Sequence, residues 1–293
     1  MLTVRPSVPA DVPVQRELWK LAFGDSDEYI GNFYSTYYRP DRVVVLEEDG
    51  TVKSMTAWFD TAFVVPGQGE YRAAYLYAVA THPDCRGRGL AGKLLAGADE
   101  YFRSLGIPAV TTVPAEPSLH NFFGANGFRE CFVHDPLAGW RENFPGTPAP
   151  PPSSLTLEPL SPAQYGALRE ELLAGIPHIA YPEDALAYQA GCCALSGGGM
   201  YRIATERGDL LACVERTEDD TPLVKELLGP PPARALFLQD LPALLRADIW
   251  ALRVPHEDGP VPGHRFGMLK WLDPEAEKVW NWDTAGYLGL AFD

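Results

Sequence analysis

Apolar side chains follow two spacings along the first half of the chain. Some runs alternate or are rich in β-branched and aromatic residues, which is typical of strands. In others, apolar residues recur every three or four positions, which is typical of amphipathic helices. In chain order, the expected elements are a strand at 2–6, helices at 11–23 and 27–38, strands at 42–46, 52–65 and 75–81, a helix at 90–105, a strand at 109–113, a helix at 118–125 and a strand at 129–133. This order predicts an α/β fold (α+β, with a mixed sheet) and does not match a repeated βαβ domain.

The stretch from Tyr75 to Leu95 joins a buried strand to a helix through a glycine-rich turn. The turn is residues 86–91, RGRGLA. A turn of this kind directs free backbone N–H groups and the positive end of a helix toward one point, which suits a phosphate group. Glycine at positions 87 and 89 lets the ligand approach the backbone with no Cβ in the way.

Three phosphate-binding patterns and one structural alternative fit these glycines. Gly87 to Lys93 matches the P-loop, but Leu94 stands where a P-loop needs Ser or Thr for Mg²⁺. Gly87 to Gly92 matches the dinucleotide pattern, but the next strand has no acid to hold a ribose. The third pattern is R-x-x-G-x-A at 86–91, directly after a strand that ends in VATHP. A purely structural turn before an amphipathic helix also stays open.

The third pattern resembles the pyrophosphate loop of the GNAT superfamily of acyl-CoA-dependent N-acyltransferases. The segment from Phe122 to Phe128, FFGANGF, is similar to the family's F-Y-x-x-x-G-F, and the resemblance covers roughly residues 1–135. It implies an N-acetyltransferase in which a primary amine attacks acetyl-CoA directly, with a central strand that parts from its neighbour to receive the pantetheine. The residues that it assigns to acetyl-CoA are Val79, Thr81, Arg86, Gly87, Arg88, Gly89, Leu90 and Ala91.

The chain departs from the family at Phe123, where the family has the tyrosine that protonates the leaving thiolate. Candidate replacements are His120 on the same short helix, Tyr75 or Tyr77 on the central strand and Glu116 just after the following strand. Each has an ordinary alternative, as an exposed helix residue, a core aromatic or a loop residue. The thiolate could also leave unaided. A chain without transferase activity would be a non-catalytic acyl-CoA-binding or regulatory protein.

Composition narrows the class of partner. The net charge of −15 argues against nucleic acid and anionic membranes, and it permits a cationic acceptor such as a small-molecule or peptide amine. The resemblance places the first two helices beside the acceptor, where Asp25, Asp27 and Glu28 could hold an ammonium group; helix capping explains them equally well. Five cysteines without a C-x-x-C pair predict neither a disulfide framework nor a metal site. With no apolar run of membrane length, the protein is expected to be cytoplasmic.

The second half repeats the first. Residues 2–17 and 155–170 share seven identities over sixteen positions, and a similar order of elements follows. Residues 143–154, rich in Pro, Gly and Ser, read as a linker between a GNAT domain at 1–142 and a GNAT-like domain at 155–293. The second domain carries three prolines at 230–232, where the turn should offer N–H donors. We therefore expect two tandem GNAT-like domains, the second degenerate and shaping the acceptor cleft or mediating a homodimer.

The end of the chain, residues 280–293, is apolar and aromatic. Residues 265–272 and 286–292 are expected as the last two strands, and the end of the chain is expected to pack within the second sheet. The alternative is a terminal carboxylate delivered into the cleft of the first half, as the resemblance to acetyltransferases of the enhanced intracellular survival type implies.

Overall fold

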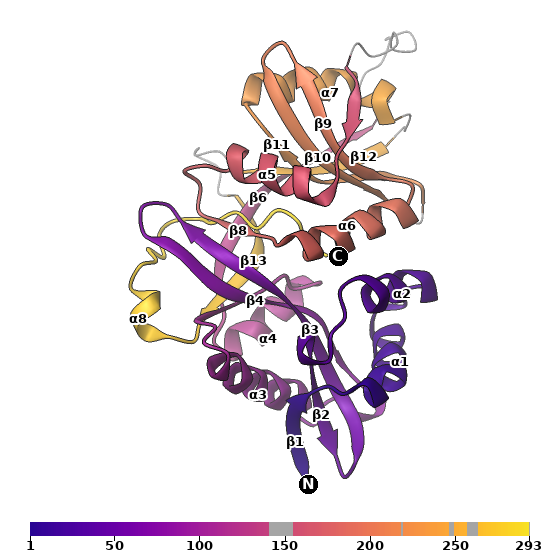
Figure 1. The fold of residues 1–293 in the computed structure, drawn as a ribbon, viewed down its shortest axis with the longest axis vertical. Coiled ribbons are helices and arrows are strands. Elements are labelled where there is room, and N and C mark those ends of the chain that lie inside the picture. The colour runs from indigo at the N-terminus through magenta and orange to yellow at the C-terminus, as the bar shows by residue number, and fades with distance from the viewer. Residues whose placement is uncertain (141–154, 218, 246–248, 257–262, 293) are drawn as a thin grey trace.

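The computed structural model describes residues 1–140, 155–217, 219–245, 249–256 and 263–292. These residues form two stacked lobes, with the first half of the chain in one lobe and most of the second half in the other (Figure 1). The predicted linker, 143–154, lies outside the described residues. The domain boundaries at 142 and 155 therefore stay predictions.

The first half has the predicted order of helices and strands. Its elements are β1 (Leu2–Pro6), α1 (Val12–Phe23), α2 (Asp27–Thr36), β2 (Val43–Glu48), β3 (Thr51–Val65), β4 (Gly69–Thr81), α3 (Leu90–Ser104), β5 (Ala109–Thr112), α4 (Pro117–Ala125) and β6 (Arg129–Trp140), with 3-10 turns at Pro9–Asp11, Pro40–Arg42 and Pro83–Cys85. Local signals set the boundaries. Ser26 caps α2 by accepting a hydrogen bond from the Tyr29 N–H at 3.1 Å. Asp49 and Gly50, both with positive φ, turn β2 into β3.

The second half repeats this order as far as β12 with one added strand, β8; among the described residues no helix separates β12 from β13, and α8 follows β13. Its elements are β7 (Leu157–Pro159), α5 (Pro162–Leu172), β8 (His178–Ala180), α6 (Glu183–Leu195), β9 (Gly199–Thr205), β10 (Gly208–Arg216), β11 (Pro222–Leu228), α7 (Pro231–Leu245), β12 (Ile249–Pro255), β13 (His264–Trp271) and α8 (Pro274–Glu277). β8 pairs with the far end of β3, beyond the reach of β2. The described strands form one 13-stranded sheet in the order β1-β2-β3-β4-β5-β13-β6-β12-β11-β10-β9-β7, with β8 beside β3.

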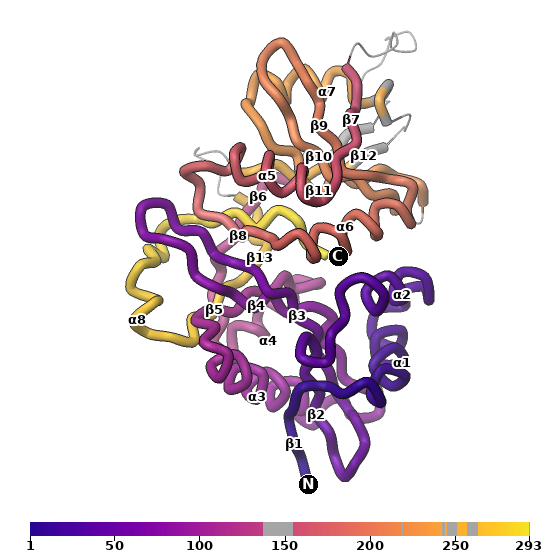
Figure 2. The backbone as a smooth tube through the Cα atoms, viewed as in Figure 1, coloured from indigo at the N-terminus to yellow at the C-terminus, as the bar shows by residue number. Residues whose placement is uncertain are grey.

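The two halves exchange their last strands. β13 lies between β5 and β6 and is antiparallel to both, although it comes from the second half of the sequence. β6, from the first half, pairs in turn with β12 of the second half. β6 and β13 lie side by side at the junction of the lobes (Figure 2). Each half therefore contributes a strand to the sheet of the other.

The end of the chain does not form the predicted strand over 286–292. Only isolated bridges are present there, from Gly286 to Phe132 and from Tyr287 to His178. The segment passes between the lobes, where its backbone groups bond to several elements instead of one neighbouring strand, and Gly289 takes a positive φ of 71°. The predicted packing within the second sheet is therefore wrong for this segment. Asp293, and with it any terminal carboxylate, lies outside the described residues.

Candidate functional site

β4 parts from β5 halfway along its length. The parallel pairing runs from Ala73 with Ala109 to Leu76 with Thr112 and stops there, whereas β4 continues to Thr81. A bulge lies directly after this point, because Ala78 takes a φ of 50° and the pairing with β3 shifts register between Met55 and Ala57. The left-handed region is strained for a residue with a Cβ, and such strain is concentrated at functional sites. Beyond Leu76, the edge of β4 that faces β5 therefore has no strand partner among the described residues, and an opening lies along this edge.

The glycine-rich turn follows this wall. Gly87 and Gly89 take φ values of 76° and 71°, and a Cβ at either would meet no atom within 4 Å. α3 starts at Leu90, and its first internal bond in this region runs from the Lys93 N–H to the Gly89 carbonyl. The backbone N–H groups from Gly87 to Gly92 donate to no residue that the structure describes. They form an anion cradle at the positive end of a helix.

The two arginines of the turn are held at its edges. Arg88 makes a two-pronged contact with Glu48, at 3.0 and 2.6 Å, and its guanidinium lowers the pKa of that carboxyl. The Arg86 Nε donates to the Thr81 carbonyl oxygen at 3.4 Å. Both arginines are exposed at the surface. Arg88 thus already has a carboxylate partner, whereas the backbone N–H groups from Gly87 to Gly92 have none among the described residues.

Tyr77 is the first residue of β4 beyond its last pair with β5. Its ring lies on the face covered by α1 and α2, 5.1 Å from Trp19 and 6.3 Å from Phe33 between ring centroids. Its hydroxyl lies 2.8 Å from the hydroxyl of Tyr188 on α6 and 3.3 Å from that of Tyr29 on α2. Burial raises the pKa of Tyr77 well above its ordinary value, so the side chain is a neutral phenol.

The other two acid–base candidates lie on α4, over the opposite face. His120 Nδ1 is 2.8 Å from Oε1 of Glu130 on β6. Glu130 Oε2 is buried with no hydrogen-bond partner among the described residues. Glu116 is exposed at the N-cap of α4, where it accepts from the Ser118 hydroxyl at 3.3 Å. Phe123 is buried in the core cluster that also holds Leu76 and Leu90.

Two of the carboxylates predicted for the acceptor, Asp25 and Asp27, have partners on α1. Asp25 accepts from the indole Nε1 of Trp19 at 2.7 Å, and Asp27 pairs with Lys20 at 3.0 Å. Glu28 lies in the first turn of α2 and is exposed. The alternative given for these residues, helix capping and first-turn position, fits Asp27 and Glu28, which lie in the first turn of α2, but not Asp25, because Ser26 is the N-cap.

In the second half, β11 also parts from its neighbour β12, but buried side chains and the end of the chain fill the resulting opening. β11 pairs with β12 only at Leu223 and Val224, and its pairing with β10 is also bulged. Glu226 follows the bulge and is fully buried, accepting from the Tyr165 hydroxyl at 2.7 Å and from Arg169 Nε at 3.0 Å. Arg169 also donates to the Leu288 carbonyl oxygen at 3.1 Å, so the end of the chain occupies this place. Prolines at 230–232 stand where the first half has its N–H donors.

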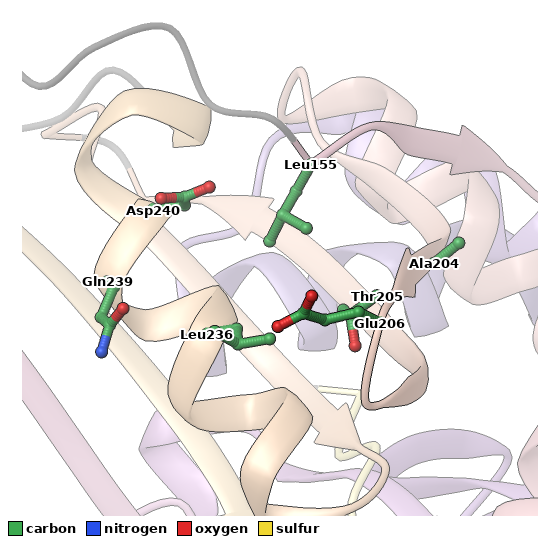
Figure 3. Close-up of a pocket in the computed structure, with 7 residues that line it drawn as sticks. All are labelled: Leu155, Ala204, Thr205, Glu206, Leu236, Gln239 and Asp240. Atoms are coloured by element: carbon green, nitrogen blue, oxygen red, sulfur yellow. The ribbon is translucent and has the colours of Figure 1, made fainter.

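A separate hollow of about 480 Å³ lies on the second half, between α7 and the turn from β9 to β10 (Figure 3). Its lining residues are Leu155, Ala204, Thr205, Glu206, Leu236, Gln239 and Asp240. None of them belongs to the first half, so this hollow is distinct from the opening between β4 and β5. Within the described residues, no group of three His, Cys, Asp or Glu side chains could hold a metal ion, and no helix is long and apolar enough to cross a membrane.

Comparisons with known proteins agree with this geometry. Residues 3–127 match the model of the acetyltransferase (GNAT) domain family. Eis1 of Mycobacterium abscessus superposes with a TM-score of 0.66 at 16% identity, covering 94% of this chain and 75% of that one. A GCN5-related N-acetyltransferase of Anabaena variabilis gives a TM-score of 0.66 at 15% identity, covering 93% and 73%.

A tandem GNAT protein from the clavulanic acid biosynthesis pathway gives a TM-score of 0.55 at 15% identity, covering 94% of this chain and 99% of that one. The sequence matches no curated protein. At these identities the structural likeness defines the fold. The first half is a GNAT domain, and the whole chain has the tandem GNAT fold. The resemblance seen in the sequence is thus confirmed for the fold of the chain, and the family match covers residues 3–127.

Proposed function

We propose that this protein is an N-acetyltransferase that transfers an acetyl group from acetyl-CoA to a primary amine of a small molecule or peptide, with its active site in the first half. The observation that carries the proposal is the opening between β4 and β5, which leads directly to a turn with unpaired N–H groups. A GNAT domain is a fold used by acyltransferases.

The residues at the opening fit acyl-CoA. A diphosphate would rest on the N–H groups of residues 87–91, next to glycines that leave open space. The Arg86 N–H, also expected to contribute, already donates to the Pro83 carbonyl oxygen at 3.1 Å, so Arg86 would act through its guanidinium. The pantetheine would lie along the unpaired edge of β4 at Val79 and Thr81. One β4 N–H at the bulge would hydrogen-bond the thioester carbonyl and stabilise the developing oxyanion. Acetyl-CoA supplies the activated acetyl group.

Two side chains flank this opening from opposite faces. Tyr77 is too weak an acid to protonate a thiolate, because burial raises its pKa, so we assign it a hydrogen-bonding role toward the acceptor amine. His120, one turn before Phe123 on α4, is our candidate proton donor to the thiolate. Glu116 is the weaker candidate, since it is exposed at the surface and its carboxylate accepts a hydrogen bond from the Ser118 hydroxyl. The second half would bind no acyl-CoA, because Glu226 and the end of the chain fill its opening.

The alternative function is non-catalytic binding of acyl-CoA. It is favoured by Phe123, which is buried and offers no hydroxyl at the family's acid position. The two functions share the same acyl-CoA site and differ only in whether thiol is released.

The test starts with calorimetric titration of acetyl-CoA, CoA, ATP and NAD into wild type, Gly89→Trp and Gly106→Trp. Gly106 is a matched control, because it also has a positive φ, 69°, and open space around it, but lies at the far end of α3. We expect micromolar binding of acetyl-CoA that is lost only in Gly89→Trp. Release of free thiol with spermidine, kanamycin, L-lysine or a peptide with a free amino terminus would then establish transfer. Binding without thiol release would favour the alternative, and absence of acetyl-CoA binding would refute both.

A further inference from the structure

The hydroxyl of Tyr77 is held from across the interface between the two lobes. Tyr188, on α6 of the second half, places its hydroxyl 2.8 Å away, whereas Tyr29 of the first half is 3.3 Å away. Tyr77 marks the point where β4 leaves β5, so these hydroxyls lie on the α1–α2 side of the opening. That side is where an acceptor would approach a thioester held along β4.

We propose that Tyr188 is a positioning residue of the first half's active site: it orients the Tyr77 hydroxyl to accept a hydrogen bond from the attacking amine. This inference rests on the proposed function and deepens it. It makes the second half, which lacks an acyl-CoA site of its own, a necessary part of the acceptor site. The acceptor chemistry that fits is an uncharged primary amine with an N–H to donate and a lone pair free for attack.

The packing of α6 against α2 fixes Tyr188 in place. Asn32 Nδ2 donates to the Tyr188 carbonyl oxygen at 3.0 Å and lies 3.4 Å from the Cys192 sulfur. Gly191 allows this approach, since a Cβ there would lie 2.2 Å from Asn32 Oδ1. The Tyr188 ring is fully buried between Phe33, Phe59 and Phe292, with centroids 5.8, 5.5 and 5.6 Å away. A side chain fixed in this way can hold another hydroxyl in one orientation.

The hydroxyls supply orientation and not protons. Burial raises the pKa of Tyr188 as well as that of Tyr77, so both stay protonated while the amine attacks. Each phenol has one proton to donate and can accept as well. If the Tyr188 hydroxyl donates to Tyr77, a lone pair of the Tyr77 oxygen faces the amine, which can then approach with its own lone pair toward the carbonyl carbon.

The experiment compares Tyr77→Phe, Tyr188→Phe, the double variant and Tyr34→Phe. Tyr34 is the matched control, because it is also a partly buried tyrosine of this region, on α2, but its hydroxyl donates to Gln15 Oε1 at 3.0 Å and not to Tyr77. The readouts are the acetyl-CoA dissociation constant, the melting temperature and the steady-state kinetics with whichever of the four amines named above releases thiol fastest.

We expect Tyr188→Phe to lower kcat/KM for the amine about three- to tenfold, the effect of one lost hydrogen bond, with acetyl-CoA affinity unchanged. Because Tyr188 acts through Tyr77, the double variant should equal Tyr77→Phe alone. Losses that multiply in the double variant, or an effect no larger than that of Tyr34→Phe, would overturn this inference and leave the transferase assignment intact. Absence of thiol release with all four amines would overturn both.

Discussion

Lys270 of β13 forms an ion pair with Asp99 of α3, and its Nζ also donates to the Asn126 carbonyl oxygen at 2.7 Å. A strand from the second half of the chain is thereby fixed to two segments of the GNAT domain. The Asp99 side chain is only 9% exposed, and its burial raises the pKa of the carboxyl against the effect of Lys270. The exchanged strand is thus held by charge as well as by backbone hydrogen bonds.

Replacing Lys270 by Met should therefore destabilise the protein. It leaves Asp99 buried without its cation, and we expect a loss of about 3 kcal/mol in the free energy of unfolding, because breaking one side of a buried pair strands a charge. Denaturant unfolding measures the loss. The control is Lys278→Met, whose exposed pair with Glu275 should contribute little. Equal stability of the two variants would contradict the expected contribution of the buried pair.

The strand exchange predicts that residues 1–142 do not fold alone. Without β13, β5 and β6 lose the strand that lies between them, and two sheet edges are left unpaired. Circular dichroism and thermal melting of this fragment should show no cooperative transition. Co-expression with residues 155–293 should restore a folded complex, and a protease site placed within 143–154 of the intact protein should give two pieces that co-elute. A fragment 1–142 that melts cooperatively would argue against this dependence.

Local signals were enough to predict most elements of the first half. The Ser26 cap and the turn at Asp49 and Gly50, which set two of the element boundaries, depend on neighbouring residues only. The strand at 265–272 was also expected and is present as β13. Its partners could not be predicted, because alternating apolar residues define a strand but not the edge on which it pairs. The opening beyond Leu76 could be predicted only from the resemblance to the GNAT family.

Only part of the candidate site could be predicted from the sequence, for a similar reason. The glycine-rich turn is contiguous in sequence, so its geometry could be predicted before the fold was known. Tyr77 and Tyr188 are 111 positions apart, and no pattern in either segment links them. Glu130 is ten positions from His120, but the pattern of its strand does not mark it as the partner of a histidine. Such partners meet only in the folded chain, Tyr77 and Tyr188 across the two halves and His120 and Glu130 within the first half.

Glu130 should support His120 if that histidine donates the proton to the thiolate. Glu130→Gln removes the negative charge 2.8 Å from Nδ1, and we expect a fall in kcat of about tenfold, the lower part of the range for general acid catalysis. The same substitution should have no further effect in a His120→Gln background, because it acts through the imidazole. Asp135→Asn is the matched control, since Asp135 contacts His256 at 2.9 Å in a similar pair at the junction of β6 and β12. A fall that persists without His120 would assign Glu130 a structural role.

Stability should fall below neutral pH because of His134, a β6 residue at the strand exchange. Burial, with the charges of Arg253 and His264, lowers the pKa of His134 from 6.5 to about 4. Its Nδ1 is buried with no hydrogen-bond partner among the described residues, and its ring lies 4.5 Å from that of Phe266. Between these two pKa values His134 is protonated in the unfolded chain but neutral in the folded protein. The stability of the folded protein with respect to this group is therefore fully present above pH 6.5 and falls as the pH decreases toward about 4. The total is up to about 3 kcal/mol. Urea unfolding of wild type and His134→Phe across this range should show a shallower pH dependence for the variant, and identical slopes would place the acid sensitivity on other groups.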